Sequence, residues 1–191
     1  MAATTNISPT IRIFDITISL IGLIATLPIL LIVTFIGFID SGSPIFIQER
    51  IGRKKSPFKL IKFRTMKAGT ASLATHLVDQ NTVTPFGKLL RKTKIDELPQ
   101  LINVFFGQMS LVGPRPGLNN QIELTSERDK RHIFTAKPGI TGLGQVNQID
   151  MSTPKKLALY DSIMLKKFSL ALYFQLIIAT ALGKGAGDKI K

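Results

Sequence analysis

The clearest pattern in the chain is an uncharged apolar run that covers residues 16–39. An α-helix rises about 1.5 Å per residue, so the run would reach about 36 Å, and the hydrocarbon core of a bilayer is about 30 Å thick. A secretory signal peptide has a shorter apolar region and a cleavage site of small residues after it, and this run fits neither feature. The pattern therefore predicts a helix that is retained in the membrane.

Pro28 stands near the middle of this run. A proline inside a helix removes a backbone donor and clashes with the preceding turn, so we expect a kink or a break there. Basic residues flank both ends, with Arg12 before the run and a cluster at residues 50–55 after it, whereas a single span carries its basic excess on the cytoplasmic side. These features favour a re-entrant helix with both ends at the cytoplasmic face. A straight, tilted span that tolerates its proline is the alternative.

Shorter patterns follow the apolar run. Residues 44–48 and 58–66 are rich in Ile and Phe and are separated by a turn-forming basic stretch, which predicts a β-hairpin with a basic tip. Residues 86–92 indicate a short basic helix. Thr93, followed three residues later by Asp96, is typical of an N-terminal cap, and we expect the helix after it to continue to about residue 106. Asp96 and Glu97 then lie in the first turn of that helix.

The C-terminal half adds a stiff Gly-Pro-Arg-Pro stretch at residues 113–116, a charged and solvated helix at 123–132 and a glycine-rich loop at 138–147. Residues 170–182 are apolar but too short to span a bilayer, so an amphipathic helix at the membrane interface is expected. The prediction is an α+β, mainly helical fold. It divides into a re-entrant membrane helix at 1–40, a globular domain at 41–183, and a basic flexible tail at 184–191.

Charge changes this picture. The chain has 25 Lys and Arg against 12 Asp and Glu, a net charge of +13, which points to anionic partners such as nucleic acid, acidic lipids or phosphorylated substrates. A mean hydropathy of +0.23 is unusual for a soluble nucleic-acid binder. The chain also has no Trp and only two Tyr for base stacking. With no Cys and two His, thiolate nucleophiles and zinc sites of the usual kind are excluded or improbable.

The remaining candidates for chemistry are carboxylates and cations. Adjacent Asp96 and Glu97 point about 100° apart on a helix, so one can face a reacting phosphorus while the other holds a metal ion. Acidic residues in a first turn also simply complement the helix dipole, and both interpretations stay open on this evidence. Arg115 lies on a rigid loop suited to gripping phosphate with a bidentate fork. The other cations that could clamp a pyrophosphate are Lys59, Lys62, Arg64, Arg91 and Lys92.

Taken together and in this order, several strings resemble the bacterial sugar transferases known as monotopic phosphoglycosyl transferases, in their short form. The resemblance covers residues 11–181, nearly the whole chain. The chain departs from the usual pattern at Leu27, Gln108 and Tyr173, which puts substrate choice and C-terminal packing in question. The matching strings are SPIF (43–46), QERIG (48–52), KFRTM (62–66), RKT (91–93), DELPQL (96–101), NV (103–104), MSLVGPRP (109–116), KPGITG (137–142) and QVN (145–147).

The resemblance implies a re-entrant helix broken at Pro28 and a globular part on the cytoplasmic face of the bacterial inner membrane, in contact with acidic lipids. It implies that Asp96 attacks the sugar-linked phosphorus of a nucleotide diphosphate sugar, by default a UDP-sugar, and forms a phosphosugar intermediate that polyprenyl phosphate then accepts. Glu97 would help to hold Mg²⁺, and Arg115, Lys62, Arg64 and Arg91 would bind phosphate. The sugar, the pathway and the oligomeric state are not encoded in these motifs.

Two other functions fit parts of the pattern. A membrane-anchored nucleic-acid binder would explain the charge and the anchor, but no recognised binding motif supports it. A membrane scaffold without catalytic activity would leave Asp96 and Glu97 as helix caps. Release of a nucleoside monophosphate from a sugar donor would exclude both.

Overall fold

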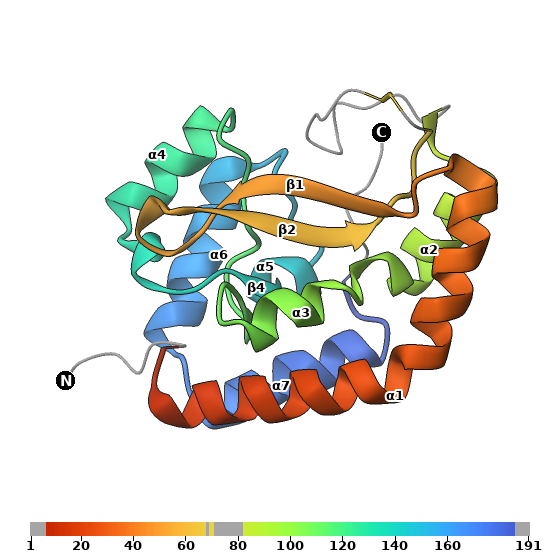
Figure 1. Ribbon diagram of the computed structural model, residues 1–191. Helices are drawn as coiled ribbons and strands as arrows, with labels where there is room; N and C mark the ends of the chain where they lie inside the picture. Colours follow the sequence, from red (N-terminus) through yellow and green to blue (C-terminus); the bar gives the residue numbers. More distant parts are fainter. Residues whose placement is uncertain (1–6, 68, 71–81, 186–191) are drawn as a thin grey trace.

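The computed structural model describes residues 7–67, 69–70 and 82–185, and this part of the chain is mainly helical with two small two-stranded sheets (Figure 1). Helix α1 (Pro9–Ser41) begins after Ser8, whose hydroxyl accepts a hydrogen bond from the Ile11 N–H at 3.2 Å. It ends at Gly42, which has a φ of 71° and closes the helix in the left-handed region. The mainly helical α+β fold is confirmed.

Figure 1 shows α1 as two arms that meet at a sharp bend, one along the bottom and one along the right side of the molecule. Pro28 lies inside this helix, where it has no N–H to donate to the preceding turn, so the predicted kink has its expected cause. The outer surfaces of both arms are apolar, with side chains such as Ile24, Phe35 and Ile39 largely exposed. By length and composition α1 could cross a membrane. Return of both ends to one face stays a prediction.

The predicted hairpin is confirmed. Strand β1 (Ile45–Ile51) pairs in antiparallel register with β2 (Pro57–Phe63), from Ile45 opposite Phe63 to Ile51 opposite Pro57. A single 3-10 turn, η1 (Arg53–Lys55), forms the basic tip.

The second arm of α1 packs against the hairpin and helix α2 (Pro85–Thr93), which corresponds to the predicted basic helix. Val33 of α1, Phe63 of β2 and Leu90 of α2 form a small buried cluster, and Ile95 packs against it. Thr84 caps α2 by accepting a hydrogen bond from the Gly87 N–H, and its own hydroxyl donates to Asp40 near the end of α1. These contacts fix α2 to the far arm of the bent helix.

The expected N-terminal cap at Thr93 is wrong. Thr93 is the last residue of α2, and its hydroxyl donates to the carbonyls of Leu89 and Leu90 one turn earlier. Lys94 then turns into the left-handed region, with a φ of 58°, and ends the helix. Asp96 and Glu97 therefore lie in a separate 3-10 turn, η4 (Ile95–Glu97), and not in the first turn of α3 (Gln100–Phe105).

The glycine-rich stretch is only partly a loop. Strand β4 (Gly139–Thr141) pairs in parallel with β3 (Ser110–Val112), and the one-turn helix α5 (Leu143–Val146) follows. A Cβ on Gly139 would lie 2.0 Å from the Gly113 nitrogen, so only glycine permits the two backbone segments to approach this closely. Glycine serves backbone packing here.

Helix α4 (Ile122–Lys130) is charged as predicted but is not wholly solvated, since Leu124, Glu127 and Arg128 are buried. It is followed by the 3-10 turn η5 (Ile133–Thr135) and later by α6 (Pro154–Lys166), which packs against it. Arg128 and Asp161 form a buried ion pair between these two helices, with an N–O distance of 2.7 Å.

Helix α7 (Leu170–Ala181) lies beside the first arm of α1 in Figure 1. Phe14 and Phe174 meet edge to face, and the Tyr173 hydroxyl donates to Asp15 at 2.9 Å. The position of α7 at the membrane interface stays a prediction. In the expected tail at 184–191, Lys184 and Gly185 fold back over the molecule, whereas residues 186–191 lie outside the described residues.

Candidate active site

The short turn η4 places Asp96 and Glu97 between α2 and α3. Backbone N–H groups of Glu97 and Leu98 donate to the carbonyls of Lys94 and Ile95, which holds the turn in 3-10 geometry. Asp96 is buried, with 8% of its surface exposed, whereas the Glu97 side chain is partly exposed. The turn therefore presents one carboxylate in the interior and the neighbouring one at the edge of a cavity.

Burial and a neighbouring charge make Asp96 a weak acid. Loss of hydration raises the pKa of its carboxyl to about 7, and the negative charge of Glu97 acts in the same direction. The cations Lys62, Arg91 and Arg115 oppose this rise. A carboxyl group surrounded by three cations and shifted toward neutrality is typical of a reactive site.

Lys62 reaches the same site from strand β2. Loss of hydration lowers the pKa of its ammonium group to about 8, with the positive charge of Arg50 acting in the same direction and Asp96 opposing it. The Lys62 ammonium lies 5.4 Å from the centre of the Phe46 ring. A desolvated cation beside a buried carboxylate gives a strong local field for an anionic substrate.

Arg115 is fixed by contacts to both its side chain and its loop. Its guanidinium donates to the Glu97 carboxylate at 2.7 Å. Its backbone carbonyl accepts from Arg128 at 2.8 Å, and the next carbonyl, that of Pro116, accepts from Arg50 at 3.1 Å. The rigidity predicted from the two prolines is thus supplemented by two buried arginines that bind adjacent carbonyls of the loop.

The other two predicted phosphate ligands differ in position. Arg91, at the end of α2, lies within electrostatic reach of Asp96 and donates from Nε to the Thr65 hydroxyl at 2.9 Å. Arg64 instead donates to the Ser43 carbonyl at 2.8 Å and stacks over the Phe46 ring at 5.3 Å. The structure therefore brings Arg91 to the reactive turn, whereas Arg64 joins the hairpin to the end of α1.

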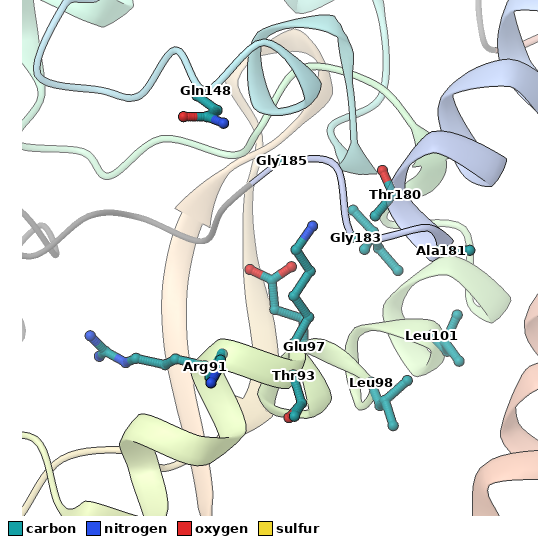
Figure 2. A pocket seen from close by; sticks show the side chains of 13 residues that line it. Arg91, Thr93, Glu97, Leu98, Leu101, Gln148, Thr180, Ala181, Gly183 and Gly185 are labelled. Carbon is teal, nitrogen blue, oxygen red and sulfur yellow. The ribbon is translucent and has the colours of Figure 1, made fainter.

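A cavity of about 590 Å³ opens beside the turn. Figure 2 shows Arg91 and Glu97 on one side of it and Leu98, Leu101 and Ala181 on the other. Its size falls in the range of small-molecule sites in proteins. The remaining lining residues are Lys92, Thr93, Lys94, Ile140, Gln148, Thr180, Gly183 and Gly185.

Four residues of this site were not among the catalytic or phosphate-binding residues predicted from the sequence. Lys94 lines the cavity, and burial lowers the pKa of its ammonium group while Glu97 opposes the change. Arg50, Arg128 and Asp161 act on the Arg115 loop, either directly or through one another. Arg128 and Asp161 are 33 positions apart, and no local motif relates them.

The described residues contain no cluster of three or more His, Asp or Glu side chains that could hold a metal ion alone. Mg²⁺, however, is usually held by one or two carboxylates together with substrate phosphates and water. The adjacent carboxylates of Asp96 and Glu97 fit that donor set when a pyrophosphate lies beside them. A zinc-type cage is not present in this part of the chain.

Comparison with known proteins gives the family. Residues 7–184 match the family model of bacterial sugar transferases. The chain is 43% identical to the uncharacterized sugar transferase EpsL of Bacillus subtilis, over 71% of this chain and 67% of that protein. It is 34% identical to the exopolysaccharide production protein ExoY of Sinorhizobium fredii, over 92% of this chain and 87% of that protein.

A longer relative has a more specific name. The chain is 37% identical to the UDP-glucose:undecaprenyl-phosphate glucose-1-phosphate transferase of Klebsiella pneumoniae, over 88% of this chain but only 38% of that protein. The family match extends from α1 to the loop after α7, so it includes both the membrane helix and the turn with Asp96 and Glu97. The chain therefore belongs to the bacterial sugar transferase family and is an enzyme, a transferase.

Proposed function

We propose that this phosphoglycosyl transferase moves a sugar phosphate from a nucleotide diphosphate sugar, with UDP as the nucleotide, to polyprenyl phosphate. The products are polyprenyl diphosphate sugar and UMP, and the reaction is the first membrane step in assembling a surface glycan or glycoconjugate. The single observation that carries the proposal is the buried Asp96 carboxyl next to Glu97 and within reach of three cations. The names of the relatives, which include a UDP-glucose:undecaprenyl-phosphate transferase, support the substrate classes.

In the first step, an oxygen of the ionised Asp96 carboxylate attacks the phosphorus that carries the sugar. A new bond forms between this oxygen and phosphorus, the bond to the bridging oxygen breaks, and UMP leaves with the electron pair. Asp96 is the buried carboxyl of this cluster, whereas the neighbouring Glu97 is partly exposed and already paired with Arg115 at 2.7 Å. The enzyme then carries a phosphosugar ester.

Three cations stabilise the charge that builds up on the phosphate oxygens. Arg115 can form a bidentate fork, while Lys62 and Arg91 contribute charge from two other elements. Arg64 would act indirectly, by holding the start of the hairpin that carries Lys62. We include Mg²⁺ in the proposal, held by Glu97 and the substrate pyrophosphate. Bound there, it would offset negative charge on the leaving UMP.

In the second step, an oxygen of polyprenyl phosphate attacks the same phosphorus and the Asp96 carboxylate leaves. A lipid acceptor fits an enzyme with an exposed apolar helix, α1, joined directly to the domain that carries the site. We place the active site on the cytoplasmic face of the bacterial inner membrane, with the basic surface against acidic lipids.

An exchange assay tests the covalent step. Without acceptor, a phosphosugar enzyme can recombine with labelled UMP, so label should pass into the UDP-sugar pool. Asp96→Asn should abolish both this exchange and complete transfer, because the amide is a poor nucleophile of similar shape. Asp129→Asn is the matched control, since Asp129 forms an exposed ion pair with Lys55 away from the turn. Full activity in Asp96→Asn would remove Asp96 from the nucleophilic role.

A further inference from the structure

The cavity beside the reactive turn has two chemically different sides. Arg91 and Glu97 lie on one side, next to Asp96. Leu98 and Leu101 line the other, together with Ala181 at the end of α7, as Figure 2 shows. A nucleotide sugar has no long apolar part that would require such a side, whereas a lipid phosphate has both a charged head and an apolar chain.

The apolar side is continuous with the membrane helix. Leu101 lies so close to α1 that a Cβ added to Gly22 would come within 3.1 Å of its Cδ1 atom. Farther along α1, Ile24 and Leu27 are exposed, and so is Leu182, directly after Ala181. The apolar wall of the cavity thus contacts α1, and exposed apolar side chains follow on α1 and directly after α7.

Lys94 stands between the two sides. Its ammonium donates to the Lys184 carbonyl at 2.9 Å, and its charge interacts with Glu97 and Arg115. The same contact holds the segment after α7 across the cavity, where Gly185 lies so close to the Gln145 backbone that a Cβ would meet its oxygen at 2.7 Å. Lys94 therefore offers a cation in the cavity to a phosphate that enters along the apolar side.

We propose that the wall formed by Leu98, Leu101 and Ala181 is the acceptor subsite, which holds the first isoprenyl units of the polyprenyl phosphate and directs its phosphate past Lys94 to the phosphosugar. This inference rests on the proposed function and adds the place and direction of acceptor entry. The nucleotide sugar then occupies the charged side. The two substrates reach the same phosphorus from different ends of one cavity.

The test separates the two half-reactions in Ala181→Phe. The added ring fills the apolar side, so the KM for polyprenyl phosphate should rise about tenfold or more, while UMP exchange without acceptor stays near the wild-type rate. Ala171→Phe is the matched control, because Ala171 is exposed on the same helix but does not line the cavity. It should leave both readouts unchanged.

A second measurement does not depend on the variant. A polyprenyl phosphate with a photoreactive group on its first isoprenyl unit should label peptides that contain residues 98–101 and 180–181 of the wild-type enzyme. An unchanged acceptor KM in Ala181→Phe, or labelling confined to other segments, would overturn the acceptor subsite. Loss of UMP exchange in a folded Ala181→Phe protein would also overturn it, by assigning this wall to the donor. Absence of exchange in the wild type would instead count against the covalent mechanism, and the KM and labelling results would still decide the subsite.

Discussion

Replacing Asp161 with Asn tests whether the buried ion pair holds the Arg115 loop. Arg128 donates to the Asp161 carboxylate from Nε at 2.9 Å and from Nη2 at 2.7 Å, and its Nη1 donates to the Arg115 carbonyl at 2.8 Å. The two side chains are only 4% and 2% exposed. The substitution preserves the shape of residue 161 but leaves the guanidinium buried without its counter-charge.

The expected loss of stability is large. Removing one partner of a buried ion pair costs about 3–5 kcal/mol, because the remaining charge stays desolvated. In a domain of this size each kcal/mol lowers the unfolding temperature by about 2–4 °C, so Asp161→Asn should unfold roughly 6–20 °C below the wild type. The ion pair between Lys130 and Glu127, on the helix that carries Arg128, gives the control. The Lys130 side chain is 64% exposed, so Lys130→Ala should lower the free energy of unfolding by no more than about 1 kcal/mol.

Thermal unfolding in detergent micelles, monitored by circular dichroism, measures the loss of stability. Transfer activity measures the effect on the Arg115 loop. A double variant, Asp161→Leu with Arg128→Met, should recover most of the stability because no charge is left buried. It should not recover activity, because Arg128→Met removes the donor to the Arg115 carbonyl. Equal unfolding temperatures for Asp161→Asn and Lys130→Ala would refute the argument, and so would full activity in the double variant.

Four further outcomes are expected. Glu97→Gln should raise the Mg²⁺ concentration needed for half-maximal transfer by about tenfold or more, measured by magnesium titration, because one anionic ligand is lost. Arg115→Lys should lower kcat by about tenfold or more, since a point charge cannot form the bidentate fork, whereas an unchanged rate would assign Arg115 to structure. Cysteines placed at Thr10 and Ile47 should both react with an impermeant thiol reagent in inverted vesicles only. Pro28→Leu should straighten α1 and expose position 10 to the reagent in intact cells.

The sequence correctly predicted the elements whose conformation depends on residues close to each other in the chain. The hairpin follows from two short Ile- and Phe-rich segments around a basic turn, and the bend of α1 follows from one proline. Thr93 shows the limit of local rules, because a threonine can cap the start of a helix or hydrogen-bond back to carbonyls at its end. Here Lys94 adopts a positive φ and decides the outcome, and no sequence pattern marks lysine for that conformation.

Asp96 and Glu97 were identified from the sequence because they are adjacent acids. Arg115 was identified because the prolines on both sides of it stiffen the loop. The rest of the site depends on contacts between distant segments. Burial raises the Asp96 pKa, and the adjacent Glu97 raises it further. The burial and the opposing cations from β2, α2 and the loop after β3 are not fixed by the residues around Asp96. Gly139 was interpreted as part of a loop, but its role is to permit contact with Gly113, 26 positions away by number.

The bend in α1 makes the spacing of α2 and α3 depend on a membrane segment. One arm packs against α2 through Val33 and Leu90, and the other contacts α3 where Gly22 meets Leu101. Because η4 joins α2 to α3, opening or closing the bend pulls on both ends of the turn that carries Asp96. A thicker or thinner bilayer changes the tilt and kink of an apolar helix through hydrophobic mismatch. We therefore expect the reaction rate to depend on bilayer thickness, and substitutions on α1 that never meet a substrate to alter catalysis.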